Sequence, residues 1–239
     1  MSRLASQGYQ VLSNVLSTDE ISGMRAAITE TVDRVASVLR APFSMSCPEA
    51  SFEDRIERIA TRDRGYGLAL FRAVMADAQR DPRIEVIIDH PRLTANLREL
   101  LAPLTRTGQV IRPRAAVPAF STASHPWHQD VVRPSNTGCG SVRIACWIPL
   151  SDVDERSGSL EVIPGVWREP LPHEVRGDGV FGISEEYLPR AERCSVPLQP
   201  GDVLVLDRYI PHRTLPVEHG KARWAVAMWV RAAEARTGC

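Results

Sequence analysis

The segment 126–130 (PWHQD) contains two side chains that can bind a metal ion, a histidine and a carboxylate two positions apart. The proline and the flanking residues favour an extended backbone, in which successive side chains point to opposite faces. His128 and Asp130 then project to one face and Gln129 to the other. The pair can therefore occupy two adjacent positions around one ion, whereas His125 has the wrong parity to join them.

A third ligand has to come from another part of the chain, and His212 is the best candidate. It follows a turn and an apolar run at 200–206, which places it at the end of a strand. Two histidines and one carboxylate, with the other coordination positions open, are the ligands of non-heme Fe(II) oxygenases. A structural zinc site would be closed by four ligands, usually including cysteine. None of the five cysteines has ligand spacing to these residues.

The histidine and carboxylate pair is a weak motif by itself, because such triplets arise often by composition. His90, His173 and His219 are interpreted as structural or solvent-exposed.

The N-terminal part, residues 1–108, is predicted to be largely helical. Residues 9–12 read as a short strand, and Ser17 with Glu20 forms a capping box at the start of a helix. Apolar residues then recur at helical spacing as far as Ala36. Residues 41–62, which contain prolines and many charges, suggest an irregular link. Helices are expected at 68–80 and 92–103.

The pattern of apolar residues changes at about residue 109, after which no helical period fits. Short β-branched or aromatic runs are bounded by turn residues, at 142–150, 160–163, 203–206 and 224–230. The simplest arrangement is a jelly roll or a similar closed double sheet at 109–239. Residues 165–195, rich in proline, glycine and charge, are too long for a hairpin turn and suggest a lid-like insertion. The whole chain, 1–239, is expected to form a single domain.

Composition excludes several classes of partner. The chain has 29 basic and 29 acidic residues, so it lacks the basic excess that nucleic acid or an anionic membrane requires. Five cysteines at scattered spacings give no disulfide framework. The N-terminus lacks the apolar core of a signal peptide, and no apolar run is long enough to span a bilayer. We expect a cytoplasmic protein; nothing in the sequence indicates its oligomeric state.

The ordered motifs resemble those of the phytanoyl-CoA dioxygenase-like family of Fe(II)/2-oxoglutarate oxygenases. The resemblance runs from about Gly8 to Arg231. It rests on segments 8–21 (GYQVLSNVLSTDEI), 127–130 (WHQD), 146–154 (CWIPLSDVD), 157–165 (SGSLEVIPG) and 198–207 (LQPGDVLVLD), followed by His212 and, eleven residues later, Arg223.

This resemblance implies a double-stranded β-helix core (jelly roll, cupin-like) flanked by α-helices, and it implies roles for six residues. His128, Asp130 and His212 would bind Fe(II), and the cosubstrates would be 2-oxoglutarate and O2. Arg223 would hold the distal carboxylate of 2-oxoglutarate, as suits a planar, always-charged guanidinium. Thr214 matches a hydroxyl position that assists this arginine. Trp147 matches a pocket wall, although an ordinary core position explains it nearly as well.

The resemblance predicts a dioxygenase that hydroxylates an unactivated C–H bond of a small metabolite or natural-product intermediate, with release of succinate and CO2. Halogenating relatives replace the carboxylate ligand with a small residue, so Asp130 argues against chlorination. The alternatives are a jelly-roll binding protein that has lost catalysis, and another metal-dependent enzyme on the same scaffold, which would have no use for Arg223.

The substrate is not specified by these motifs. Arg133 and Arg143 flank the metal segment, and Arg143 shares strand parity with Trp147. It could therefore face the pocket and bind an anionic substrate, or it could pair with a structural acid. Relatives usually continue the Pro-Gly turn with Ser-His, whereas this chain has Val166 and Trp167. That change could report a different substrate or a purely structural exchange.

Overall fold

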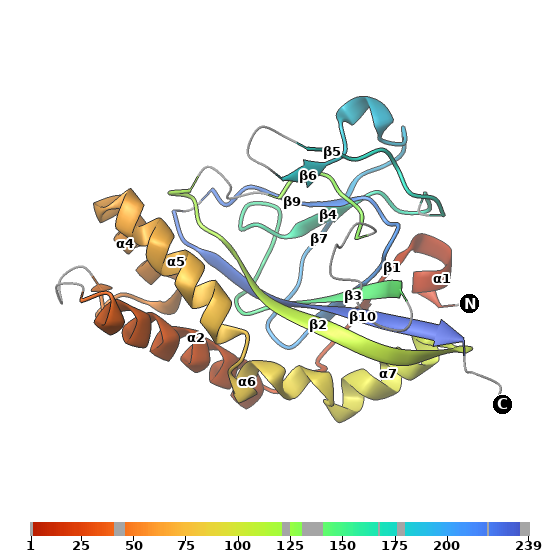
Figure 1. Ribbon diagram of the computed structural model, residues 1–239. Coiled ribbons are helices and arrows are strands. Elements are labelled where there is room, and N and C mark those ends of the chain that lie inside the picture. The colour runs from red at the N-terminus through yellow and green to blue at the C-terminus, as the bar shows by residue number, and fades with distance from the viewer. Residues whose placement is uncertain are drawn as a thin grey trace.

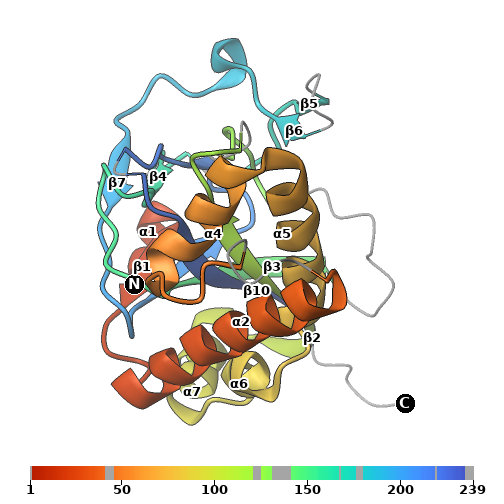
Figure 2. The ribbon, with the colours of Figure 1, turned by 90° about the vertical axis from the view of Figure 1, so that its left-hand side faces the viewer.

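The computed structural model describes residues 2–40, 46–120, 125–130, 141–166, 168–175, 180–218 and 220–234. Its helices lie mostly in the first half of the chain (Figures 1 and 2). They are α1 (Arg3–Gln7), α2 (Thr18–Val38), α4 (Phe52–Arg62), α5 (Arg64–Ala78), α6 (Pro82–Glu85) and α7 (Pro91–Leu101), with 3-10 turns at Val86–Ile88 and Glu185–Tyr187. Among the described residues, none of these helices is both long and apolar enough to cross a membrane.

The strands form two facing sheets and a small hairpin. They are β1 (Tyr9–Leu12), β2 (Leu104–Ala116), β3 (Ser141–Pro149), β4 (Leu160–Val162), β5 (Glu174–Val175), β6 (Phe181–Gly182), β7 (Cys194–Val196), β8 (Val203–Asp207), β9 (His212–Thr214) and β10 (Arg223–Glu234). The large sheet has the order β1-β8-β3-β10-β2, the small sheet β7-β4-β9, and β5 pairs with β6. All pairings between the described strands are antiparallel. This double sheet, with helices beside it, confirms the expected jelly-roll architecture.

Side chains of the large sheet alternate between two cores. On β3 and β10, Cys146 and Met228 belong to the core shared with the helices, whereas Trp147 and Ala227 belong to the core between the two sheets. Figure 1 shows the helices along one side of the large sheet and the small sheet on the other. Because both faces are covered, β10 reads as a nearly continuous apolar run rather than an alternating one.

Helix α2 begins as its sequence predicts. The side chain of Ser17 accepts a hydrogen bond from the backbone of Glu20, and the Glu20 carboxylate accepts one from the backbone of Ser17. The buried face of α2 includes Met24, Ile28 and Val32, which pack against the helix-side core. The expected helices at 68–80 and 92–103 correspond to α5 and α7.

The expectation of an irregular link at 41–62 is wrong for its second half, which forms α4. Ser51 caps this helix by accepting a hydrogen bond from the backbone of Asp54. Ile56 and Ile59 are fully buried on one face. The charges that suggested a linker lie mostly on the solvent side, and Arg55, which is buried, is paired with Asp33 of α2. Residues 41–45 lie outside the described residues.

Substitutions in α4 test whether this segment is a helix with one buried face. Because Ile59 is fully buried in the helix-side core, we expect Ile59→Ala to lower the free energy of unfolding by about 2–5 kcal/mol. Urea denaturation followed by circular dichroism measures the change. Arg58→Ala, on the exposed side of the same helix, should alter it by no more than about 0.5 kcal/mol. Equal effects of the two substitutions would contradict the buried placement of Ile59.

Candidate functional site

Three candidate ligands, from two segments more than 80 residues apart in the chain, meet at one point. His128 and His212 form an isolated antiparallel bridge, in which each backbone N–H donates to the other residue's carbonyl, at 2.9 and 3.0 Å. The backbone N–H of Asp130 donates to the carbonyl oxygen of Arg208 at 2.9 Å. The potential ligand atoms of the two histidines and Asp130 then all lie within 4.8 Å of one another. Parity along 128–130 is as predicted, although the extended pairing is limited to this bridge.

The hydrogen bonds of the two histidines leave one particular ring nitrogen available on each. Nδ1 of His128 lies 2.9 Å from the carbonyl oxygen of Pro126, and Nδ1 of His212 lies 3.0 Å from that of Ile210. A carbonyl oxygen can only accept, so each Nδ1 carries the proton and each Nε2 keeps a lone pair. Nε2 of His212 is 3.9 Å from Oδ2 of Asp130.

Burial keeps His128 in the neutral form that can bind a metal. Desolvation, with a smaller contribution from His212, holds the pKa of His128 well below its ordinary value. The two imidazole rings lie 4.1 Å apart between centroids. Two neutral imidazoles and one carboxylate fit a divalent iron ion that retains open coordination positions. Among the described residues, no cysteine joins this group.

Arg223, the first residue of β10, is buried in the same region. Its guanidinium lies over the ring of Trp147, 5.1 Å from the centroid. Gly158 makes room for it: this residue has a φ of +83°, and a Cβ there would come within 3.3 Å of Nε of Arg223 and 2.8 Å of Val217. Burial, and secondarily the charge of Arg114, lowers the pKa of Arg223 to about 9. In the part of the chain that the structure describes, neither Nε nor Nη1 of Arg223 has a hydrogen-bond partner.

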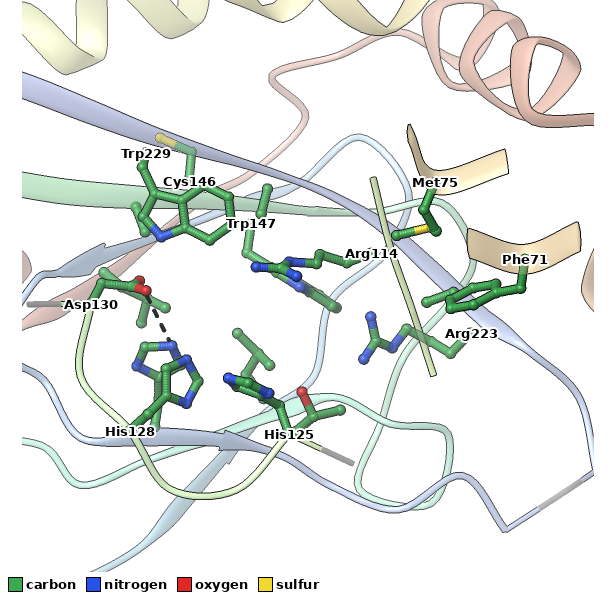
Figure 3. A pocket seen from close by; sticks show the side chains of 17 residues that line it. Phe71, Met75, Arg114, His125, His128, Asp130, Cys146, Trp147, Arg223 and Trp229 are labelled. Atoms are coloured by element: carbon green, nitrogen blue, oxygen red, sulfur yellow. Dashed lines mark ion pairs between the residues drawn. The ribbon is translucent and has the colours of Figure 1, made fainter. Parts of the chain in front are cut away.

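The three ligands and Arg223 line one cavity of about 220 Å³ (Figure 3). Thr214 is also in the wall, one strand pleat after His212 and on the same side. Trp147 belongs to both the wall and the core between the sheets, so both interpretations of this residue hold. Other lining residues are Phe71, Met75, Arg114, Ala115, His125, Ala145, Cys146, Leu160, Leu206, Ala227 and Trp229. All six predicted site residues therefore face a common space.

A family model described as phytanoyl-CoA dioxygenase (PhyH) matches residues 4–225. The chain belongs to this family. Membership confirms the family that the sequence motifs resemble, and the donor set at 128, 130 and 212 fits a metal ion with open coordination positions. The matched region includes every segment on which the sequence resemblance rests.

Individual relatives are more distant. The chain is 28% identical over 101 residues to the peroxisomal phytanoyl-CoA dioxygenase of Rattus norvegicus, a match that covers 38% of this chain and 28% of that protein. The crystal structure of SnoK, a non-heme α-ketoglutarate-dependent carbocyclase from nogalamycin biosynthesis, is 20% identical, covers 97% of this chain and 83% of its own, and has a TM-score of 0.62. The non-heme monooxygenase ThoJ is 19% identical, with 97% and 78% coverage and a TM-score of 0.63. These two structures share the fold of this PhyH-family chain.

Arg143, which strand parity allowed to face the pocket, lies elsewhere. The register between β3 and β10 shifts at Val230 and Arg231, which leaves Arg143 as the extra residue of a bulge. Arg143 lines a different hollow, beside Asp207 and Arg208. Burial raises the pKa of Asp207, and the charge of Arg143 is among the smaller effects that oppose this rise. This agrees with the structural alternative. Arg133, Trp167 and His219 lie outside the described residues.

Arg114 and His125 line the cavity although the sequence did not identify either as a site residue. The ring of His125 packs edge-on against His128, with centroids 4.2 Å apart. The sequence analysis predicted no strand around residue 114, so it gave no face for this side chain; β2 is seen only in the structure. Of the histidines interpreted as structural, His90 caps α7 by accepting a hydrogen bond from Leu93.

Gln129, between two of the candidate ligands, attaches the insertion to the metal segment. Its side-chain amide donates to the carbonyl oxygens of Glu169 and Tyr209, and its side-chain oxygen accepts from the backbone N–H of Leu171 at 2.7 Å. Its backbone N–H donates to Nε2 of His173 at 3.0 Å. His173 is therefore a structural partner of the metal segment. The described part of the insertion at 168–173 is held directly against residues 128–130.

Affinity for Fe(II) should distinguish His128, a candidate ligand, from its neighbour His125. We expect His128→Ala to weaken Fe(II) binding by more than about 100-fold, because one of three protein ligands is lost. His125→Ala, in which the removed ring touches His128 but is not part of the ligand group, should bind within about threefold of the unmodified protein. Anaerobic equilibrium dialysis measures both. Full iron affinity in a folded His128→Ala protein would contradict the assignment.

Loss of the Gln129 side chain should detach the insertion. We expect Gln129→Ala to increase amide hydrogen exchange at 168–173 by at least about tenfold, because three side-chain hydrogen bonds to that segment and to Tyr209 are removed. Exchange in β8, which Gln129 does not contact, is the internal control. Unchanged exchange at 168–173 would show that other contacts hold the segment.

Proposed function

We propose that this protein is an Fe(II)/2-oxoglutarate-dependent dioxygenase that hydroxylates an unactivated C–H bond of a small molecule. The observation that carries the proposal is a single cavity with a three-residue candidate metal site at one side and, at the other, a buried guanidinium whose Nε and Nη1 have no described hydrogen-bond partner. A dicarboxylate can bridge these two groups. A cavity of about 220 Å³ is smaller than the sites of drug-sized ligands, which supports a small substrate.

His128, Asp130 and His212 would hold the iron, and their surroundings suit this role. Each histidine presents Nε2, since its Nδ1 proton is held by a backbone carbonyl two residues earlier. These carbonyls fix the ring orientation and raise the basicity of the ligand nitrogen. With 2-oxoglutarate and O2, the iron supplies an oxidant that can attack a C–H bond, and the by-products are succinate and CO2.

Arg223 would hold the distal carboxylate of 2-oxoglutarate. A buried charge without an acidic partner is unfavourable, and a carboxylate that accepts hydrogen bonds from this guanidinium removes that cost. Trp147 orients the guanidinium by stacking, and Gly158 leaves the space that it occupies. Thr214 stands in the same wall, where its hydroxyl can assist the arginine.

The remaining residues of the cavity would protect the reaction. Phe71 and Met75 of α5 close one side with apolar atoms, which limits the access of water. The segment at 168–173, bound to Gln129, is placed to act as part of a lid. Asp130 occupies the ligand position that a halide needs in halogenating relatives, which favours oxygen transfer over chlorination.

Two other functions remain as alternatives from the sequence. A binding protein that had lost catalysis would be expected to lack at least one of the four charged or ligating groups, whereas all four line this cavity. A different metal enzyme on the same scaffold gives no role to Arg223. Both alternatives are therefore less well supported than the oxygenase.

Anaerobic titration of the purified protein with Fe(II) and 2-oxoglutarate tests the proposal. We expect a weak visible charge-transfer absorption that requires both components and is missing in His128→Ala. Exposure to air should then produce succinate, and a substrate should increase its rate of formation. Folded, iron-loaded protein that gave no absorption would rule out the oxygenase and favour a binding role or another metal chemistry.

Removal of the Arg223 guanidinium should weaken the binding of 2-oxoglutarate without lowering the unfolding temperature of the free protein. We expect Arg223→Met to weaken 2-oxoglutarate binding by about 30-fold or more, the effect of removing one partner of a buried charged pair. Without ligand, the variant should unfold at the same or a higher temperature, because an unpaired buried charge has been removed. Calorimetry and thermal denaturation measure the two effects. A variant that bound 2-oxoglutarate normally would contradict the assignment.

A further inference from the structure

Strand register places Arg114 in the cavity, on the same face as the proposed cosubstrate anchor. Arg114 of β2 lies directly opposite Ala225 of β10, and opposite residues of an antiparallel pair share a face. Ala225 belongs to the core between the two sheets, as does Trp229. The guanidinium of Arg114 lies over the ring of Trp229, 5.0 Å from its centroid. Figure 3 shows it directed into the space between Asp130 and Arg223.

The guanidiniums of Arg114 and Arg223 share one cavity, and the charge of Arg114 contributes, after burial, to the lowered pKa of Arg223. Two guanidiniums in one cavity repel each other, and an anion that enters between them reduces this repulsion. A substrate that carries a carboxylate can supply that anion while 2-oxoglutarate is held by Arg223.

We propose that Arg114 binds a carboxylate of the substrate, so that the enzyme oxidises small carboxylic acids. The proposal rests on the oxygenase function and names its substrate class. A planar guanidinium fixed against an indole ring can form two parallel hydrogen bonds to a carboxylate. The cavity is small, and His125 in its wall is exposed to solvent. The acid group would enter first, and the rest of a larger substrate would extend past His125.

A second source of the same chemistry is the carboxylate of 2-oxoglutarate that lies nearer the iron. Arg114 could serve that group instead of a substrate acid. The two cases predict different losses in an Arg114 variant: a substrate acid site leaves 2-oxoglutarate affinity nearly unchanged, whereas a cosubstrate site lowers it.

Paired probes and three variants test the proposal. The probes are small acids with their primary amides, benzoate with benzamide and hexanoate with hexanamide, which differ mainly in charge. Calorimetry measures their binding to the protein before iron is added and to the anaerobic complex with Fe(II) and 2-oxoglutarate. Arg114→Gln removes the charge, and Arg114→Lys keeps it without the planar fork. Arg112→Gln is the matched control, because Arg112 lies on the same strand outside the cavity and donates to Gln79.

We expect at least one acid to bind about tenfold more tightly than its amide, and the preference to disappear in Arg114→Gln. Arg114→Lys should keep part of it, and Arg112→Gln all of it. In the protein without iron, Arg223→Met should also retain the preference, which separates the two guanidiniums. Affinity for 2-oxoglutarate should change less than about threefold in Arg114→Gln.

Several results would overturn the proposal. They are equal binding of every acid and its amide, an acid preference that survives Arg114→Gln, and a preference that is lost in Arg223→Met instead. A fall of about tenfold or more in 2-oxoglutarate affinity on Arg114→Gln alone would assign Arg114 to the cosubstrate. Failure of the oxygenase function is distinct: the charge-transfer absorption would be missing in the unmodified protein, while the acid preference before iron addition would still report on Arg114.

Discussion

Two backbone hydrogen bonds between His128 and His212 are the constraint on which the site depends. Each residue donates to and accepts from the other, so the bridge fixes the distance and the orientation of both side chains without using either imidazole. A third backbone bond, from Asp130 to Arg208, brings the carboxylate to the same point. The ligand set is thus held by the main chain, and the imidazoles are left to orient through their own bonds to carbonyl oxygens.

The double covering of the large sheet explains how buried cations can be placed beside this site. Helices cover one face of the sheet, and the small sheet covers the other, so that side chains on β10 alternate between two dry cores. Arg223 and Arg114 emerge on the face between the sheets, each stacked on a tryptophan. The indole rings support the guanidiniums, yet a ring does not neutralise a charge. Anionic ligands that enter the cavity can neutralise charges placed in this way.

The segment around Gln129 serves two purposes because its side chains alternate. His128 and Asp130 point to the candidate metal position, and Gln129 points away, to the insertion. The alternation therefore connects the candidate metal site to the segment at 168–173 through one side chain. Alternation did not predict the side of Arg143 correctly. A bulge in β3 breaks the two-residue period there, and the side chain lies in the hollow beside Asp207.

The helical first part and the β-rich second part could be predicted from the sequence, because they depend on local period, on capping and on residue types at fixed spacing. The sequence also named six candidate site residues, which the folded chain brings to one cavity. It misread α4, because charges on an exposed helical face resemble those of a linker. The position of Arg114 in the cavity, and of Arg143 outside it, is visible only in the folded chain. Such positions depend on the register between strands far apart in the chain, and one bulge or one unpaired residue reverses them.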